Sequence, residues 1–259
     1  MNDLELEQAG LRVHQEDAVL TVVLDRAGSR NSQTPALWRA LAAVGRDLDP
    51  SVRAVVLLAE GPSFSAGLDR AMFSLDGIPG EPSLPTIAAM PPHELDALIA
   101  GYQEAFTWWR ECDAVTVAGV QGHAVGAGFQ LALACDLIVV DPTASFAMKE
   151  PALGLVPDLG GTAPLVAAVG YPRALEICAS GRWVHAEEAL ALGLAVGAAQ
   201  AGHLREAIDT LLGPILAAPA GAVSATKHLL REAPGRSPHE QRRAERAAQA
   251  GRLASLLGA

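Results

Sequence analysis

Short apolar runs separated by longer amphipathic segments make up the first two-thirds of the chain. The apolar runs are rich in Val, Leu and Ile and have the length of buried strands. These runs are residues 11–25, 53–59, Val115–Val120, Leu137–Val140 and 144–146. The first run is long enough for a hairpin-like pair of strands, with a polar turn predicted at residues 15–17.

Segments with helical periodicity lie between these runs. Thr34-Pro35 predicts the start of a helix that ends near Leu48, and residues 93–110 predict a long amphipathic helix. Residues 77–92 are rich in Pro and Gly and have no period, which predicts a loop. Strands that alternate with helices predict an α/β fold.

From Thr162 the pattern is helical almost to the end of the chain. We predict breaks in it near Gly181, at 193–197, at Gly213-Pro214 and at 234–238. A weak recurrence of strand, small-residue turn and helix in the earlier part indicates a stacked repeat. The sequence therefore predicts an α/β fold with a helical C-terminal part.

Composition and charge exclude several classes of function. Half of the 259 residues are hydrophobic and only 4% are aromatic, so the core is built mainly from Ala, Leu and Val. The net charge of −10 disfavours non-specific nucleic-acid binding, and no apolar run reaches the length of about 18 residues that membrane insertion needs. The acidic start MNDLELEQAG resembles neither a signal nor a transit peptide, which predicts a cytoplasmic location.

The three cysteines are widely spaced in apolar surroundings. This pattern favours buried thiols in a reducing compartment over a disulfide or a metal site, so no metal is expected.

The stretch VAGVQGHAVGAGFQLALACD, residues 117–136, carries the clearest signal for chemistry. The strand Val115–Val120 leads through residues 122–128, which hold three glycines, into a buried helix predicted at 129–135. Such a turn directs free backbone N–H groups at one point, where a phosphate or an oxyanion can bind. Neither a Walker lysine nor a dinucleotide-binding pattern is present, which favours the oxyanion.

A second turn of the same kind, GPSFSAGLDRAMF, follows the strand at 53–59, with Asp69 as a predicted helix N-cap. Two such turns can supply a two-donor hole for the carbonyl of a thioester or ester, each donor being worth roughly 3 kcal/mol in the transition state. The alternative is that both are tight turns in which glycine serves packing alone.

Three blocks of the chain resemble the crotonase superfamily of enoyl-CoA hydratases and isomerases. FSAGLD resembles the F-x-A-G-x-D block, VQGHAVGAG the G-x-x-x-G-G-G block, and FAMKEPALGLVPDLGGT the third block of that family. The blocks occur in the family's order, and the resemblance extends from about Val13 to Lys227.

The resemblance implies a fold and an assembly. It implies a spiral of β-β-α repeats over residues 1–200, which would bind acyl-CoA, and a helical region over 201–259 that would form trimers or dimers of trimers. It also implies no separate cofactor, because CoA is part of the substrate.

The resemblance further assigns binding residues. The backbone N–H groups of Leu68 and Ala127 would form the oxyanion hole, although the family usually has glycine at Ala127. We expect Ala127 to keep a free backbone N–H and to have a backbone conformation that residues other than glycine can adopt. The turns would also place the following residues at the substrate: Ser65, Ala66, Gly67, Asp69 and Gly126.

Arg26, Arg30 and Lys227 would bind the CoA phosphates, the alternative being that they are solvated surface cations. Residues 72–95 usually shape the acyl pocket in this family. Their apolar side chains, among them Met72, Phe73 and Met90, predict an apolar acyl chain.

The acids select the reaction. Family hydratases use two glutamates, whose positions here are held by Gln130 and Glu150. An amide cannot take up a proton at neutral pH, so efficient hydration is not expected. Asp158 stands where the family's dienoyl-CoA isomerases have an aspartate. As alternatives, Glu150 could be a surface acid and Asp158 a helix N-cap.

Three functions follow from these residues. The first is an enoyl-CoA isomerase in which Glu150 and Asp158 are the acid and base. The second is a weak 2-enoyl-CoA hydratase in which Gln130 positions water for Glu150. The third is a non-catalytic acyl-CoA carrier. His123, close to the predicted hole, is expected to be structural, and Asp136 and Asp141 are expected to cap or pair.

Overall fold

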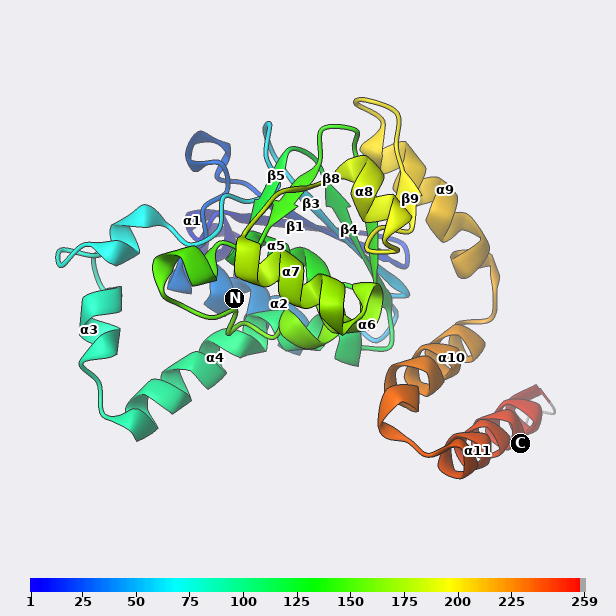
Figure 1. The fold of residues 1–259 in the computed structure, drawn as a ribbon. Helices are drawn as coiled ribbons and strands as arrows, with labels where there is room; N and C mark the ends of the chain where they lie inside the picture. The colour runs from blue at the N-terminus through cyan, green and yellow to red at the C-terminus, as the bar shows by residue number, and fades with distance from the viewer. Residues whose placement is uncertain (257–259) are drawn as a thin grey trace.

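A computed structural model of the chain describes residues 1–256 (Figure 1). The strands are β1 Leu11–Glu16, β2 Val19–Leu24, β3 Ala54–Ala59, β4 Val115–Val120, β5 His123–Val125, β6 Leu137–Val140, β7 Ser145–Ala147, β8 Val184–His185 and β9 Gly197–Ala198. The α-helices are α1 Asp3–Gln8, α2 Pro35–Arg46, α3 Leu84–Ala88, α4 Pro92–Glu111, α5 Ala127–Ala134, α6 Thr162–Val169, α7 Tyr171–Ser180, α8 Ala186–Ala191, α9 Leu204–Ala217, α10 Ala220–Glu232 and α11 Pro238–Leu256. Short 3-10 helices are η1 Ala27–Ser29, η2 Arg70–Phe73, η3 Glu150–Leu153 and η4 Ala233–Gly235. The last three residues of the predicted region 201–259 lie outside this description.

Within residues 1–256 the strands form two sheets. The larger sheet has the order β1-β2-β3-β4-β6-β9, with an antiparallel hairpin at β1 and β2 and parallel pairing beyond it. The smaller sheet has the order β5-β7-β8, and Ser65, which follows β3, adds a single bridge to Ala124 of β5. In the middle of the chain, β4 and β6 of the larger sheet are each followed by a strand of the smaller sheet, β5 or β7, and then by an α-helix, α5 or α6, which agrees with the predicted spiral of β-β-α units.

Both faces of the larger sheet are buried. Val55 and Leu57 of β3 belong to the main core, which includes residues of α2, α4 and α5. Ala54 and Val56 face the opposite way and pack with Ile208 of α9 (Figure 1). A strand buried on both faces has apolar residues at every position, which explains the continuous apolar runs of the sequence.

The structure corrects four predicted boundaries. The segment 77–92 is not all loop: α3 forms within it, started by Ser83, whose hydroxyl accepts from Thr86 N. The glycine-rich segment 122–128 contains β5, and two-residue strands, β8 and β9, form near the breaks predicted at Gly181 and at 193–197. These short elements depend on pairing with distant strands, which a local pattern does not reveal.

The fourth correction concerns Gly213-Pro214. Instead of ending there, α9 continues to Ala217 with Pro214 inside it. The helix is held by burial of Ile208 and Leu212 against the sheet, and the Arg53 guanidinium binds carbonyl oxygens of its last turn. Tertiary packing thus outweighs the local cost of proline in a helix.

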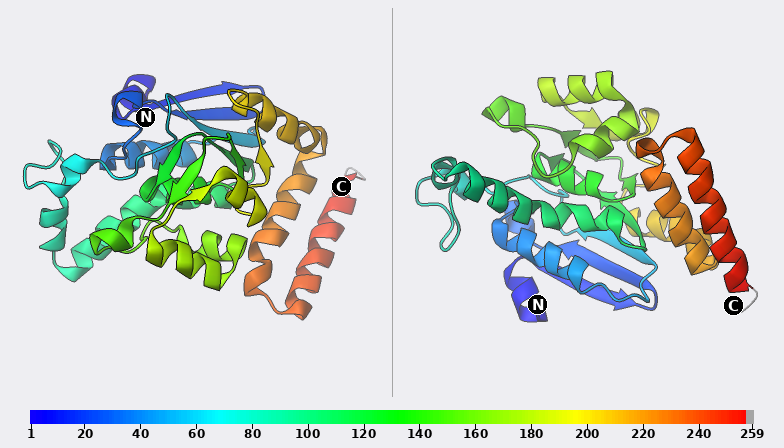
Figure 2. Two further views of the ribbon diagram at one scale, coloured as in Figure 1. Left: turned by 45° about the horizontal axis from the view of Figure 1, so that its top comes forward. Right: turned by 90° about the horizontal axis from the view of Figure 1, so that it is seen from below.

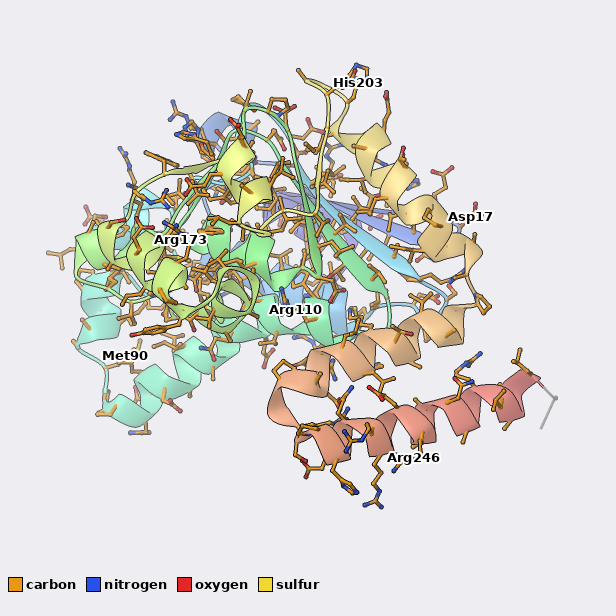
Figure 3. The ribbon with its side chains drawn as sticks, turned by 45° about the vertical axis from the view of Figure 1, so that its right-hand side comes forward. Asp17, Met90, Arg110, Arg173, His203 and Arg246 are labelled. Carbon is orange, nitrogen blue, oxygen red and sulfur yellow. The ribbon has the colours of Figure 1, made fainter. Side chains whose placement is uncertain are left out.

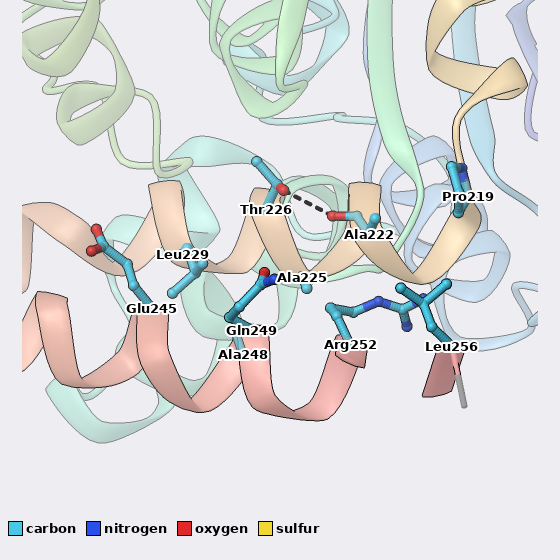
Figure 4. A pocket seen from close by; sticks show the side chains of 10 residues that line it. All are labelled: Pro219, Ala222, Ala225, Thr226, Leu229, Glu245, Ala248, Gln249, Arg252 and Leu256. Carbon is cyan, nitrogen blue, oxygen red and sulfur yellow. Dashed lines mark hydrogen bonds between the residues drawn. The ribbon is translucent and has the colours of Figure 1, made fainter. Parts of the chain in front are cut away.

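The helices α10 and α11 form a hairpin that extends from the rest of the molecule (Figure 2). They contribute no fully buried side chain within the described residues, whereas α9 packs on the sheet. A hollow of about 290 Å³ lies between them and is lined by residues of both helices, among them Thr226, Leu229 and Arg252 (Figure 4). The division predicted at residue 200 and the trimer remain predictions.

Among residues 1–256 no single helix has the length and apolar character to cross a membrane. The pair Leu204–Ala217 and Ala220–Gly235, bent by 107°, meets that criterion only when the two are taken together.

Candidate active site

The first turn, residues 65–69, is held beside Gln33. Gln33 N donates to Gly67 O (2.7 Å) and Asp69 N donates to Gln33 O (2.8 Å). In this parallel bridge the N–H of the intervening residue, Leu68, points away from Gln33. No acceptor for it is found in residues 1–256, so Leu68 offers a free backbone donor.

Side chains of the preceding loop fix the first turn. Ser65 is fully buried; its Oγ donates to Asn31 O (2.7 Å) and accepts from Gly67 N (3.2 Å). Asn31 in turn donates from Nδ2 to Glu60 O (2.8 Å) and Ser63 O (2.9 Å). The turn therefore rests on a buried polar network rather than on apolar packing.

Asp69 extends this network. Its Oδ2 accepts from Ser32 Oγ (2.7 Å) and Arg26 Nη2 (3.2 Å), and its Oδ1 accepts from Ala71 N (3.1 Å), which confirms the predicted N-cap. Burial alone would raise the pKa of Asp69, but these hydrogen bonds together lower it below its usual value. Arg26 is therefore engaged inside the protein. Its predicted role toward a CoA phosphate remains a prediction.

The second turn, residues 125–128, depends on glycine. Gly126 has φ 52° and ψ −117°, a conformation open in practice only to glycine, and its N–H donates to Ala147 O (2.9 Å). Ala127 is the first residue of α5 and has no positive φ, so the expectation that a non-glycine residue fits there is confirmed. The N–H of Ala127 has no acceptor in residues 1–256, as is usual for the start of a helix.

The two turns lie against each other. A Cβ added to Gly67 would lie 2.5 Å from Val125 O and 3.6 Å from Ala127 N. The free donors of Leu68 and Ala127 therefore belong to adjoining segments. They remain the predicted pair for one carbonyl oxygen.

The helix behind Ala127 is buried along its length. All eight residues of α5 are buried, and Arg110 of α4, labelled in Figure 3, binds the carbonyl oxygens of Leu133 (3.2 Å) and Cys135 (3.0 Å) at its other end. A cation at the C-terminal end complements the helix dipole, which leaves the positive end at Ala127.

Glu150 lies against the second turn. A Cβ on Gly126 would be 3.2 Å from Glu150 Oε1. Oε1 accepts from Gln130 Nε2 (2.7 Å), whereas Oε2 is buried without a partner in residues 1–256. Burial raises the pKa of Glu150, and the negative charge of Asp158 raises it further, against the opposing effect of the Gln130 hydrogen bond. Glu150 is thus a carboxyl group suited to proton transfer, not a surface acid.

Asp158 follows η3 in the loop before α6. The residue as a whole is exposed, yet enough protein surrounds its carboxyl group to raise its pKa through burial. Its negative charge contributes to the raised pKa of Glu150. Its backbone oxygen accepts from Gln103 Nε2 of α4 (2.6 Å), which ties this loop to the long helix.

The other predicted residues take separate positions. Ala66 and Arg30 are exposed, and Ala66 N donates to Arg30 O (2.8 Å). The His123 ring lies 5.2 Å from the Trp183 ring, in line with a structural role.

Lys227 is buried at the base of the C-terminal hairpin. Its Nζ lies 2.8 Å from Asp136 Oδ2 and donates to Trp109 O (3.1 Å) and Ala114 O (2.6 Å), with 8% of the side chain exposed. Asp136 also accepts from Thr116 N (2.8 Å), which confirms that it pairs. These contacts give Lys227 a structural role in this conformation, and binding of CoA phosphate remains a prediction.

Sequence reasoning missed the buried segment Asn31, Ser32 and Gln33, which supports the first turn. Its signal was a run of short polar residues directly before the Thr34 cap, which in the sequence is typical of an exposed loop.

Comparisons with known proteins identify a family that this chain resembles over most of its length. A model of the enoyl-CoA hydratase/isomerase family matches residues 14–254. A Thermus thermophilus protein named as a candidate enoyl-CoA hydratase is 35% identical over 220 residues, 84% of this chain and 82% of that one. The "Probable enoyl-CoA hydratase EchA17" of Mycobacterium bovis is 33% identical over 233 residues, 89% of this chain and 84% of that one.

Solved structures match as well. A candidate enoyl-CoA hydratase of Thermobifida fusca YX, crystallised with acetoacetyl-CoA, superposes with a TM-score of 0.94 at 46% identity over 98% of both chains. The same description applies to a crystal of it with CoA, which covers 100% of this chain and 98% of that one, again at 46% identity and a TM-score of 0.94.

Proposed function

The chain belongs to the enoyl-CoA hydratase/isomerase family, and from that premise we propose that it shifts a double bond in a fatty enoyl-CoA, with Glu150 and Asp158 as acid and base. As a member of this family it is an acyl-CoA-processing enzyme. The observation that carries the finer proposal is the Glu150 carboxyl group, which lies against the second turn and is hydrogen-bonded by Gln130, in a site where Gln130 replaces a second glutamate.

The proposed reaction needs one proton taken from the acyl chain and one returned to it. Ionised Glu150 removes a proton from C2 of a 3-enoyl-CoA, and the electron pair moves into the thioester carbonyl to give an enolate. Leu68 N–H and Ala127 N–H stabilise the enolate oxygen. The electrons return through the chain as C4 takes a proton from the protonated carboxyl group of Asp158, which gives the 2-enoyl-CoA. A proton then passes from Glu150 to Asp158, so both carboxyl groups regain their starting states and the cycle balances.

The pH dependence follows from the state of Glu150. Burial raises the pKa of Glu150, so its ionised form is less favoured here than in an exposed glutamate. A base must be ionised to act, so the rate should rise as the pH rises through this pKa. A raised pKa also brings the base closer to the working pH, where general base catalysis is efficient.

Hydration is the second candidate, because the similar proteins are named as hydratases. Glu150 could deliver the elements of a bound water across a 2-enoyl-CoA double bond. The geometry favours this less, since Gln130 uses its amide on Glu150 and the backbone.

The deciding experiment is an assay in D₂O with 2-enoyl-CoA and 3-enoyl-CoA of matched length, followed by mass spectrometry. Double-bond migration with deuterium incorporation and no added water supports isomerisation. A product heavier by one water supports hydration. Unchanged substrates together with measurable CoA binding would overturn both and favour the carrier.

Glu150→Gln should lower kcat by about 10²–10⁴-fold. Glu187→Gln is the matched control, because it removes an exposed acid from α8. Full turnover by Glu150→Gln would contradict the assignment.

The acyl group is proposed to be apolar, because Met72 is buried and Phe73 is 41% exposed beside the first turn. Comparing acyl chains of increasing length tests this, and a preference for polar acyl groups would contradict it.

Assembly through the C-terminal hairpin is proposed as well. Leu230 of α10 and Leu253 of α11 are 70% and 51% exposed, which favours a covered surface in a trimer or a dimer of trimers. Light scattering on the protein and on Leu230→Glu measures this. A monomeric wild-type protein would overturn it.

A further inference from the structure

Gln130 contacts both parts of the site that carry an acid. It is 1% exposed and comes from the first turns of α5. Its Nε2 donates to Glu150 Oε1 (2.7 Å), and its Oε1 accepts from Leu159 N (2.9 Å) and Gly161 N (3.3 Å). One amide thus joins η3 to the loop that begins with Asp158.

The orientation of this amide is fixed by its partners. Two backbone N–H groups require an acceptor, so the oxygen faces Leu159 and Gly161 and the NH₂ group faces Glu150. Packing holds the side chain as well, because a Cβ on Gly161 would lie 2.7 Å from Gln130 Cγ. The amide is therefore locked in position and direction.

Gln130 is the one side chain found to hydrogen-bond the Glu150 carboxylate in residues 1–256. The titratable groups around Glu150 are Asp158, in the following loop, and Cys178, on α7. Lys149, the preceding residue, does not neutralise it, since its Nζ donates to Gly181 O. Gln130 is therefore the side chain that stabilises the ionised form of Glu150, in addition to the backbone N–H groups of Glu150 and Lys149.

Asp158 is held from two sides. The backbone carbonyl oxygen of Asp158 accepts from Gln103 Nε2. The backbone N–H of the next residue, Leu159, donates to Gln130 Oε1. We propose that Gln130 is a positioning residue that holds Glu150 directly and Asp158 through Leu159, and so sets the arrangement of the two carboxyl groups. This inference rests on the proposed function for its kinetic consequences but not for its structural ones.

A glutamate at position 130 would fill the same volume with different chemistry. Its one oxygen could still accept from Leu159 and Gly161, but its other oxygen would face Glu150 Oε1 at the distance that the amide now occupies. Two carboxylates that close must share a proton. The uncharged donor is thus the feature that keeps Glu150 available as a base.

The test compares Gln130→Leu, Gln130→Glu and Gln103→Leu with the wild type. The first measurement is a ¹³C NMR titration of glutamate carboxyl groups in the ligand-free protein, with the Glu150 signal assigned through Glu150→Gln. Both Gln130 variants should move the titration of Glu150 to higher pH. Gln103→Leu removes the other support of Asp158 but keeps the Gln130–Glu150 hydrogen bond, so it should move the Glu150 titration less than either Gln130 variant.

Kinetics supply the second measurement. In both Gln130 variants the acid limb of the kcat/KM profile should move to higher pH, and kcat should fall by about 10-fold or more while KM changes little. Without the Gln130 amide, Glu150 and Asp158 are no longer held in a fixed arrangement. Exchange at C2 needs only Glu150, whereas migration needs both groups, so exchange of C2 deuterium should increase relative to double-bond migration. A merely structural role would not change this ratio.

Gln130→Glu is included in case Gln130→Leu misfolds. The glutamate keeps an oxygen that can accept from the backbone N–H groups of Leu159 and Gly161. An unchanged Glu150 titration in both Gln130 variants would overturn the proposal. If the wild type proved inactive, the proposed function would fail, and the titration in the ligand-free protein would still decide the role of Gln130.

Discussion

The first turn, residues 65–69, and the second turn, residues 125–128, each present one free backbone N–H, but they are held in different ways. Both turns contain a glycine with positive φ, Gly67 or Gly126. The first turn is also held by hydrogen bonds that Asn31 and Ser65 donate and that Asp69 accepts. The glycine conformation of Gly126 and the buried helix α5 hold the second turn. Two equivalent backbone N–H donors can thus be positioned either by a hydrogen-bond network or by backbone conformation and helix packing.

The difference predicts how each turn responds to change. A network of several hydrogen bonds weakens step by step, because each bond contributes about 0.5–1.5 kcal/mol. A backbone conformation that only glycine adopts responds differently. Any substitution there adds a Cβ that strains the backbone, so the loss is not gradual. The following predictions, from the largest effect on turnover to the smallest, test this contrast.

Gly67→Ala should have the largest effect, because it damages both turns. The new Cβ would lie 2.5 Å from Val125 O at a residue with φ 82°. The turns must then separate, so we expect kcat/KM to fall by about 10³-fold or more, measured by steady-state kinetics. Gly28→Ala is the control, since its Cβ would meet nothing within 4 Å. A variant with half of the wild-type kcat/KM would contradict the close contact.

Gly126→Ala should reduce kcat/KM by about 10²-fold, through strain at φ 52° and through displacement of Glu150. The added Cβ would lie 3.2 Å from Glu150 Oε1 and force the carboxylate aside. The Glu150 titration should therefore change more in this variant than in Gly67→Ala, whose added Cβ meets Val125 O and not the carboxylate. The same titration in both would contradict the separate roles of the two glycines.

Asp69→Asn should reduce kcat/KM by only about 10-fold, because Arg26 and Ser32 lose one partner within a larger network. The pKa of Asp69 is lowered in the folded protein, so its contribution to stability is fully present above the usual value of 3.8. That contribution is lost as the pH falls through the folded-state pKa. Chemical denaturation at several pH values should show the wild type and the variant converging in acid; a constant difference would contradict this.

Lys227→Met should change turnover least and stability more. Breaking the buried pair with Asp136 should lower the free energy of unfolding by about 3 kcal/mol, measured by denaturation. Asp136→Asn is the matched variant, because it breaks the pair but keeps the cation. A KM for acyl-CoA that rises only in Lys227→Met would support the predicted CoA contact, and equal KM values would contradict it.

The sequence by itself determined the features that depend on neighbouring residues. Glycine at 67 and 126, the Thr34 and Asp69 caps and the apolar runs of the sheet each act within a few residues, so their patterns can be read locally. They predicted both turns, most strands and the family. Glu150 and Asp158 are proposed from the same local signal, because both lie in the third block that resembles the family.

Tertiary structure alone decided which partners the polar side chains take. Gln130 meets Glu150 across 20 residues of chain, and Lys227 is placed close to Asp136 by the docking of α10. Pro214 stays helical because α9 is buried against the sheet. The physical reason is that a local pattern fixes backbone conformation, whereas the partner of a charge or an amide depends on which distant groups packing brings within hydrogen-bond reach.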